Sequence, residues 1–427
     1  MRRGILSGAA ILLVWGVLSS TSAPAQELNG ATILRAVAGL NHTQPPSDVI
    51  VRGQAGLDTA LGYAPPDPMS PLPLYSTRPE NGGLFTFGQF VLYRQSIPLE
   101  DQIIAVRGFQ DFDGSASGVV GAFVGPRTPA LDTGMVDGPR SWQPGFRVGL
   151  GWRFRDGSTV ELSWMHLTKT LYSAVATLVP PGGPRLGNAS DTFLFSGVSN
   201  FPADFAGPAN DIDQGNPGAT FGIWNAADLM TIDFVQRNEF VDITYRHSVY
   251  ETEDHRFYGM IGPSFAWFWE RFKWRTADFD NTGVAIPADT AIYSNTVSNR
   301  MYGVKVGCGH ERYLGHGFAV SLDIYGGAYL DVVKKRVKFE RGDRNAGPER
   351  KRSRTDFTVA GMLQGNVNLH WYPIEGVQMR LGYDVMTFFN TIASPRPVDF
   401  DYSAVNPRFE HVFRILDGLQ LGVGLVF

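Results

Sequence analysis

The last nine residues of the chain constrain its fold more than any other segment. Apolar side chains occupy every second position to the end of the chain: Leu419, Leu421, Val423, Leu425 and Phe427. A period of two places these side chains on one face of a β-strand. A soluble sheet can show the same period, but it rarely does so at the extreme C-terminus with a terminal aromatic residue. The segment therefore predicts the closing strand of a membrane β-barrel.

Residues 1–25 have the pattern of a secretory signal peptide. Arg2 and Arg3 precede an apolar run over residues 5–18, and the small residues Ala23 and Ala25 follow it. The run is too short to anchor the chain as a helix, and no later stretch of about 18 uninterrupted apolar residues exists. If the chain crosses a membrane, we therefore expect it to do so with strands.

Composition is consistent with this prediction and excludes some functions. The mean hydropathy is only -0.10, as expected where lipid-facing and lumen-facing side chains alternate. Cys308 is the single cysteine, which excludes an intramolecular disulfide framework and a cysteine-based zinc cluster. The 41 acidic residues outnumber the 37 basic ones, so nucleic acid is not an expected partner.

Residues 26–83 form a separate, proline-rich segment. Its prolines concentrate near the end: Pro65, Pro66, Pro68, Pro71, Pro73 and Pro79. Because proline cannot donate a hydrogen bond to a ladder, these residues do not belong to central strands. We predict a periplasmic segment, with a plug inside the barrel as the alternative.

Residues 84–427 are expected to form the barrel. The clearest hairpin begins with alternating apolar residues: Phe146, Val148, Leu150, Trp152 and Phe154. Asp156 and Gly157 then favour a tight turn before the return strand. The same pattern recurs three times, with short turns near residues 251–255, 314–317 and 373–376.

Counting these strands with a first one at 84–93 and a last one at 413–427 gives ten. The long connections all fall on the side opposite to the short turns, near residues 95–143, 177–229, 273–295, 339–354 and 392–406. The predicted fold class is therefore all-β, a transmembrane antiparallel up-and-down β-barrel of about 10 strands with short periplasmic turns and long outer loops. Twelve strands is the alternative, if residues 103–109 pair with residues 119–124 inside the barrel.

Aromatic residues are expected in two girdles at the membrane surfaces. One lies beside the short turns and comprises Trp152, Phe154, Phe257, Trp371 and Phe427. Trp267 and Trp269 lie further along a strand and predict the second girdle.

Three segments resemble the planctomycete-type family of outer-membrane β-barrel porins. They are residues 145–152 (GFRVGLGW), residues 85–88 (FTFG) and residues 417–427 (DGLQLGVGLVF). The resemblance covers most of residues 84–427 and implies a β-barrel in the bacterial outer membrane. The terminal Phe427 strand resembles the signal that implies recognition by the barrel-assembly machinery.

No motif of a known enzyme class occurs. The sequence contains no phosphate-binding Gly-rich loop, no His-Glu-x-x-His and no Gly-x-Ser-x-Gly elbow. His166 and Ser163 are candidates for a lipase-type dyad, but strand alternation puts them on opposite faces. We therefore expect no enzymatic activity and no cofactor.

The face opposite to the apolar one carries charged and amide side chains of both signs. This lumen-facing set is Arg147, Arg153, Glu161, Asp242, Arg246, Lys305, Asp323, Asp331, Gln364, Asn366, Asn368, Arg380, Asp384 and Arg414. In a barrel of ten strands the lumen is narrow, so ion-pair networks are favoured over a selective filter. The function predicted from this set is a passive porin or channel for small solutes, and the alternative is a structural or surface-interaction barrel with a closed lumen and ligand-binding outer loops.

Two further patterns fall in the predicted outer loops. One is basic and includes Lys334, Lys335, Arg336, Arg350, Lys351 and Arg352. It predicts contact with lipopolysaccharide phosphates or another polyanion, with a solvated hairpin tip as the alternative. The expected partners are therefore outer-membrane lipid, lipopolysaccharide and the barrel-assembly machinery, and the sequence leaves the oligomeric state open.

The other pattern is a repeated Asp-apolar-Asp. It occurs at Asp111/Asp113, Asp211/Asp213, Asp278/Asp280 and Asp399/Asp401. Each pair supplies too few oxygens for a calcium site of about six to eight ligands. Acidic loop tips are the favoured interpretation, and metal binding stays open.

Overall fold

The computed structural model describes residues 83–426 apart from 112, 121, 126–127, 137, 139–141, 178–192, 203–221, 253, 280–283, 343–349 and 375. The predicted signal peptide and nearly all of the proline-rich segment lie outside the described residues. Phe427, the last residue of the predicted assembly signal, also lies outside them.

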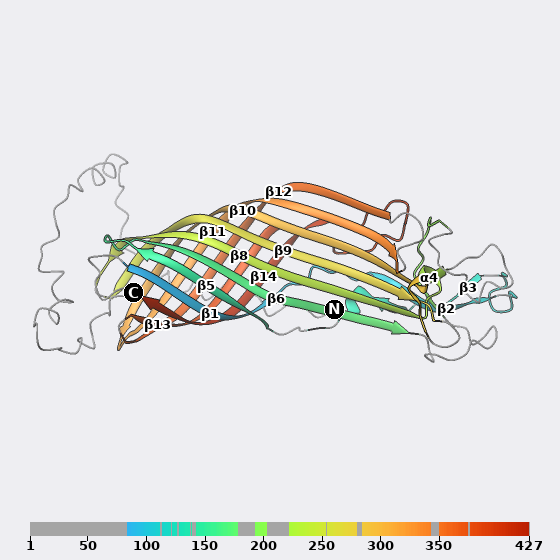
Figure 1. Ribbon diagram of the computed structural model, residues 1–427, viewed down its shortest axis with the longest axis horizontal. Helices are drawn as coiled ribbons and strands as arrows, with labels where there is room; N and C mark the ends of the chain where they lie inside the picture. Colours follow the sequence, from blue (N-terminus) through green and yellow to red (C-terminus); the bar gives the residue numbers. More distant parts are fainter. Residues whose placement is uncertain are drawn as a thin grey trace, which may run out of the picture. The chain divides into compact units, whose positions relative to one another are not determined.

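Ten strands close into an antiparallel barrel, as predicted (Figure 1). Around the ring they follow the order β1, β14, β13, β12, β11, β10, β9, β8, β6 and β5. Their bounds are β1 (Gly83–Gln95), β5 (Gln143–Arg153), β6 (Thr159–Thr177), β8 (Leu229–Glu251), β9 (His255–Ala277), β10 (Thr290–Gly315), β11 (Phe318–Arg341), β12 (Arg350–Ile374), β13 (Val377–Ala393) and β14 (Glu410–Val426). The first strand joins the last, with Phe85 opposite Val426.

The alternative with twelve strands is wrong, although its pairing occurs. β2 (Ile103–Asp111) does pair with β3 (Ala122–Val124). Both strands belong to a separate small sheet with β4 (Pro129–Asp132) and β7 (Phe193–Phe195). The barrel is already closed by the pairing of β1 with β5, so it has no edge to which these strands could add.

The short turns lie where the sequence predicted them. At the first, the N–H of Phe154 donates to the carbonyl of Ser158 at 2.8 Å, and Gly157 has a φ of 79°. Few residues other than glycine adopt this left-handed conformation without strain. β10 and β11 are joined in the same way by a turn that ends at Gly317, and β12 and β13 by one that ends at Gly376.

An apolar belt covers the outer wall of the barrel. Large side chains from many strands are 36–75% exposed, including Val148, Leu150, Leu162, Ile243, Ile261, Val304, Leu330, Val367, Leu381 and Leu421. The girdle predicted beside the short turns is exposed at Trp152, Phe154, Phe257 and Trp371. A continuous apolar surface of this kind is stable in lipid and not in water, so this is a transmembrane barrel. No helix among the described residues is long and apolar enough to cross a membrane.

Two of the predicted long loops are much shorter than expected. β9 continues to Ala277 and β10 begins at Thr290, and β11 and β12 likewise extend to Arg341 and from Arg350. We predicted that these strands end where the alternation of apolar side chains ends. Backbone hydrogen bonds do not need apolar side chains, so the ladders continue above the belt with polar residues.

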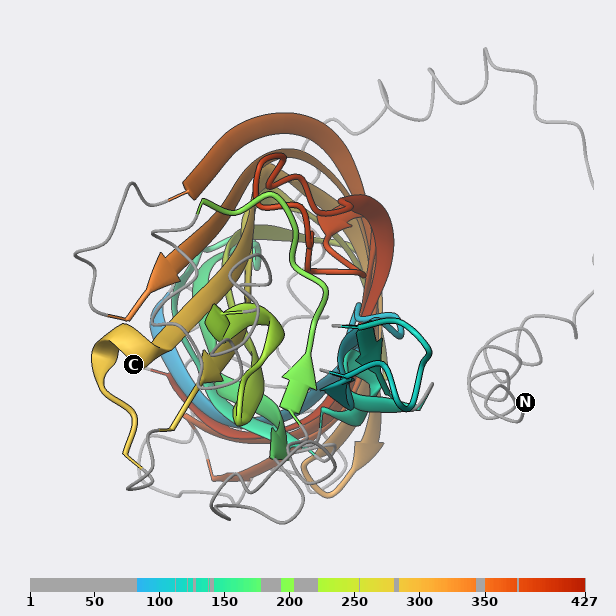
Figure 2. The ribbon, with the colours of Figure 1, turned by 90° about the vertical axis from the view of Figure 1, so that its right-hand side faces the viewer.

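Segments of three outer connections fold over the mouth of the barrel. Figure 2 looks down the barrel from this end and shows β7, α4 (Gly222–Asn225) and the connection between β13 and β14 inside the ring. Two short helical turns, Thr133–Met135 and Pro287–Asp289, belong to connections at the same end. The segments bury a core with the upper parts of the barrel strands, including Trp224, Trp274 and Phe339.

Candidate functional site: the barrel interior

All the predicted lumen residues lie on the strand faces opposite to the exposed apolar belt. Asp242, Asp323, Asp331, Gln364, Asn366, Asp384 and Arg414 are almost fully buried there, while Arg147, Arg153, Glu161, Arg246 and Arg380 are partly buried. The structure does not bring these residues into one site. It distributes them over three polar layers along the barrel axis, with an apolar layer between the second and the third.

The first polar layer lies at the end with the short turns. Tyr258 donates to Asp323 at 2.5 Å, and the Arg246 guanidinium lies 4.4 Å from the centre of the Tyr258 ring. Arg380 donates to Asn368 at 2.7 Å. These residues, with Glu161, line a cavity of ≈ 60 Å³, which is room for a few waters at most.

The second polar layer contains two connected groups. In one, Lys305 forms an ion pair with Asp242 at 2.7 Å. In the other, Tyr93 donates to Asp384 at 2.8 Å, and the Gln364 amide donates to the same carboxylate at 2.9 Å. Pairing of this kind offsets the cost of desolvating charged groups, so the layer fits the predicted network.

Arg147 also belongs to the second layer. Its guanidinium donates to the Ser163 hydroxyl at 3.2 Å. Ser163 therefore points into the lumen, whereas the His166 Nδ1 atom lies 3.2 Å from the Glu239 carboxylate on the outer wall. The two residues lie on opposite faces of β6, as predicted, and form no dyad.

A cluster of buried apolar side chains lies next along the barrel. This apolar layer comprises Val91, Tyr93, Met165, Leu167, Phe240, Ala266, Phe268, Met301, Tyr329, Ala360, Met362, Met386, Phe388 and Leu416. The ring centres of Phe268 and Phe388 are 4.9 Å apart, and those of Phe240 and Phe268 are 5.6 Å apart. Rings this close exclude water between them.

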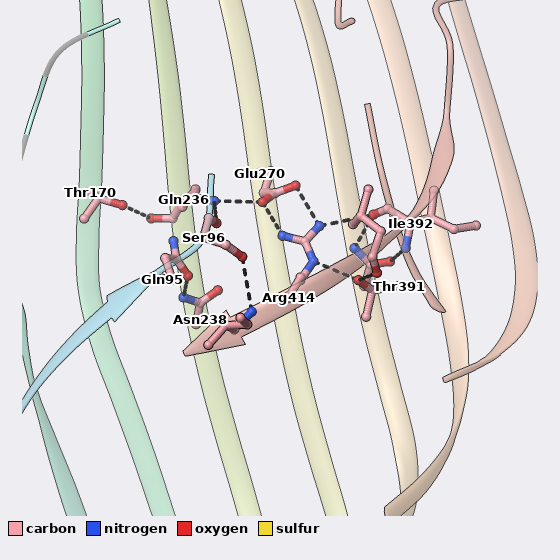
Figure 3. A network of polar contacts seen from close by, with 12 residues as sticks. Gln95, Ser96, Thr170, Gln236, Asn238, Glu270, Thr391, Ile392 and Arg414 are labelled. Carbon is pink, nitrogen blue, oxygen red and sulfur yellow. Dashed lines mark hydrogen bonds and ion pairs between the residues drawn. The ribbon is translucent and has the colours of Figure 1, made fainter. Parts of the chain in front are cut away.

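A third polar layer lies on the far side of the apolar one and centres on Arg414 (Figure 3). Its guanidinium forms a double hydrogen bond with the Glu270 carboxylate, and the Nη2–Oε2 distance is 2.9 Å. Arg414 also donates to the Thr391 hydroxyl at 2.9 Å, and Gln236 donates to Glu270 at 2.9 Å. Both charged side chains are at most 5% exposed.

Sequence reasoning found Arg414 but missed its partner. Glu270 has the same strand parity as Phe268 and Phe272, which both face the interior of the barrel. The alternation of the strand therefore places Glu270 on the inward face from the sequence alone. The sequence does not show that Glu270 pairs with Arg414, because the pair joins β9 to β14 across the lumen.

The predicted polyanion residues divide between the two faces of the wall. Lys334, Arg336 and Lys351 point outward, as their registers with outward-facing neighbours show. Lys335 points inward and pairs with Asp356 at 2.8 Å. These residues lie on strands β11 and β12. The expectation that they form the tip of an outer loop is therefore wrong.

Arg350 and Arg352 face the interior as well. They donate to the backbone carbonyls of Ser403 and Ala404 and so hold the connection between β13 and β14. These two arginines serve a contact within the protein. Binding of an external polyanion by these residues stays a prediction.

Aspartates of the predicted pairs accept hydrogen bonds from their own loops, where the structure describes them. Asp111 accepts hydrogen bonds from the N–H groups of Ala116 and Ser117, at 3.0 and 2.6 Å. Asp401 accepts from the Ser403 N–H and hydroxyl, at 2.9 and 2.7 Å. Within the described residues, no group of three or more His, Cys, Asp or Glu side chains could hold a metal ion. Asp211, Asp213 and Asp280 lie outside the described part.

The fold and its interior define a transmembrane antiparallel β-barrel whose lumen is packed in layers. No family model and no curated protein matches the chain. Among solved structures, it is similar to the outer membrane protease OmpT from Escherichia coli, with 8% identity over 81% of this chain and 97% of that one, and a TM-score of 0.35. It is also similar to OprG from Pseudomonas aeruginosa, with 9% identity over 80% and 96% and a TM-score of 0.23, and to the toluene transporter TodX from P. putida, with 7% identity over 81% and 90% and a TM-score of 0.21.

Proposed function

We propose that this protein is a bacterial outer-membrane barrel with a closed lumen that presents its folded outer connections as an interaction surface. The observation that carries the proposal is the apolar layer around Phe240, Phe268 and Phe388, which lies between two polar layers of the barrel interior. A hydrated path for small solutes would have to pass through this layer. A cavity of ≈ 20 Å³ lies between this layer and the second polar layer, which is room for about one water and not for a continuous hydrated path.

The location in the outer membrane rests on four features. They are the signal-peptide pattern, the apolar belt, the even number of strands with short turns at one end, and the alternating terminal strand. The last of these also supports recognition by the barrel-assembly machinery. Leu419, Leu421, Val423 and Leu425 are all exposed on the outer wall.

The passive porin is the second candidate. It is favoured by the cavity of ≈ 60 Å³ among Glu161, Arg246 and Arg380 at the end with the short turns. To conduct, the layers above this cavity would have to separate. Their separation would lower the stability of the barrel, because it would break the buried ion pair of Arg414 and Glu270.

Conductance in planar bilayers tests the proposal. We expect no conductance from the wild type, while an open porin in the same bilayers gives steady steps. The variant Arg147→Gln/Arg153→Gln/Arg380→Gln should lower the stability of the barrel, or create conductance where there was none, because it breaks lumen contacts.

The matched control removes the same charge from exposed sites by Arg155→Gln/Arg312→Gln/Arg396→Gln. It should change neither stability nor conductance. Steady conductance of the wild type, with a reversal potential that moves toward cation preference in the lumen variant only, would establish the porin and refute the closed barrel.

A further inference from the structure

A trough of basic and hydroxyl side chains crosses the outer wall directly above the apolar belt. Arg271 and Lys273 on β9 form one side, and Arg336 and Lys334 on β11 form the other. The floor is β10, where the outward-facing residues at this level are Ser294, Thr296 and Ser298, and Arg300 follows them toward the belt. The registers align Arg271 with Thr296 and Arg336, and Ser298 with Lys334. We call these residues, with Ser294, the basic trough.

The cations of the trough have no carboxylate held against them. Within the described part of the chain, Arg271, Lys273, Lys334 and Arg336 make no ion pair, and the buried Nε of Arg271 has no hydrogen-bond partner. Asp233, opposite Lys273 on β8, and Glu340 on β11 are the opposing charges that act on Lys273. The trough therefore has more donors and more positive charge than the protein itself satisfies.

Like charges crowd one another at this position. Arg271, Lys273 and Arg275 follow one another on the same face of β9, and Arg237 lies on the neighbouring strand β8 opposite Trp269. An anion in the trough would relieve this repulsion. Arginine and hydroxyl donors fit phosphate oxygens, which accept several charge-assisted hydrogen bonds at once.

The surroundings of the trough favour an amphiphile over a soluble anion. Trp269 lies at its edge, with the Arg237 and Arg271 guanidinium groups 5.1 and 5.2 Å from its ring. Tryptophan at this height marks the boundary between acyl chains and headgroups. On the same strand as the floor, Tyr302, Val304 and Val306 are 51–56% exposed and belong to the apolar belt. A molecule with a phosphate in the trough would lay its chains along these residues.

We propose that the basic trough binds the phosphate of a phosphorylated lipid of the outer leaflet, with the acyl chains on the belt below it. The proposal rests on the barrel spanning a lipid membrane, but not on whether its lumen is closed. It assigns the site to Arg271, Lys273 and Arg336, and it gives Lys334 and the hydroxyl groups of Ser294 and Thr296 supporting contacts.

Binding of lipid A to the purified barrel in a neutral detergent tests the site. Native mass spectrometry would compare bisphosphorylated lipid A with the same lipid after removal of its phosphates. The wild type should prefer the phosphorylated form by about tenfold or more, because charge-assisted hydrogen bonds are lost with each phosphate. Arg271→Gln/Lys273→Gln/Arg336→Gln should abolish this preference and keep the heat-modifiable migration of a folded barrel.

The matched control is Arg350→Gln/Arg352→Gln/Arg354→Gln, which removes the same charge from the inward face of β12. It should keep the preference of the wild type. Loss of preference in the control as well, or its retention in the trough variant, would overturn the proposal. So would equally tight binding of inorganic phosphate, because that result would identify a site for a free anion. A barrel that folds and stays soluble without detergent would instead refute the membrane location, and this outcome is separate from the others.

Discussion

Removing one partner of the buried pair formed by Arg414 and Glu270 should cost more stability than removing both. The two side chains are 3% and 5% exposed and lie between two apolar clusters. Arg414→Met leaves the Glu270 carboxylate in a low-dielectric interior with Gln236 as its remaining donor. We expect this variant, and Glu270→Leu, each to lower the free energy of unfolding by about 3–5 kcal/mol.

The double variant Arg414→Met/Glu270→Leu should be much less destabilised. It removes both charges together and replaces them with apolar side chains of similar volume, which is often nearly neutral. The single changes should therefore be strongly non-additive, with a coupling energy of a few kcal/mol in the double-mutant cycle.

Urea unfolding of the barrel in vesicles, followed by heat-modifiable migration and tryptophan fluorescence, measures all four proteins. Arg155→Gln, an exposed arginine near a short turn, serves as the control and should stay within about 0.5 kcal/mol of the wild type. The reasoning is refuted if the single variants each lose less than about 1 kcal/mol and their effects add. That result would mean that the layer is hydrated and that the lumen is not sealed at this level.

Three further predictions concern the outer loop, the belt and the terminal strand. Hydrogen bonds from the Ser403 side chain, the Asn200 side chain and the Ser403 N–H lower the pKa of Asp401. Their stabilisation is therefore complete above the unfolded-state pKa of about 3.9 and is lost as the pH falls through the lower folded-state pKa. Protection of the Ser403 N–H from hydrogen exchange, relative to the intrinsic rate at each pH, should fall in acid in the wild type but not in Asp401→Asn, and equal profiles would contradict this. Leu381→Arg places a charge in the belt and should cost about 2–4 kcal/mol in urea unfolding, whereas Ser353→Arg above the belt should cost little, and equal costs would show that the belt is misplaced. Deletion of Phe427 should reduce the amount of folded barrel in the outer membrane, and an unchanged yield would count against its role as an assembly signal.

Alternation along the chain was enough to predict most of the barrel. The strands, the short turns at Gly157, Gly317 and Gly376, and the inward or outward direction of nearly every predicted side chain follow from a period of two and from turn chemistry. These are local properties, and a closed antiparallel barrel between short turns allows few other arrangements. The ends of the long strands were the main exception, because backbone pairing continues above the belt where the apolar pattern stops.

The sequence by itself therefore determined which face of each strand meets lipid and which faces the lumen. The tertiary structure decided which inward side chains meet. Arg414 and Glu270 are 144 residues apart and pair only because the closed ring brings β14 and β9 to face each other. It also decided that β11 continues through Lys334, Lys335 and Arg336 and that β12 begins at Arg350, so that these residues alternate between the two faces of the wall. The number and sign of the charged residues predict neither how the lumen is packed nor how the outer connections fold. Both depend on contacts between segments that lie far apart in the sequence.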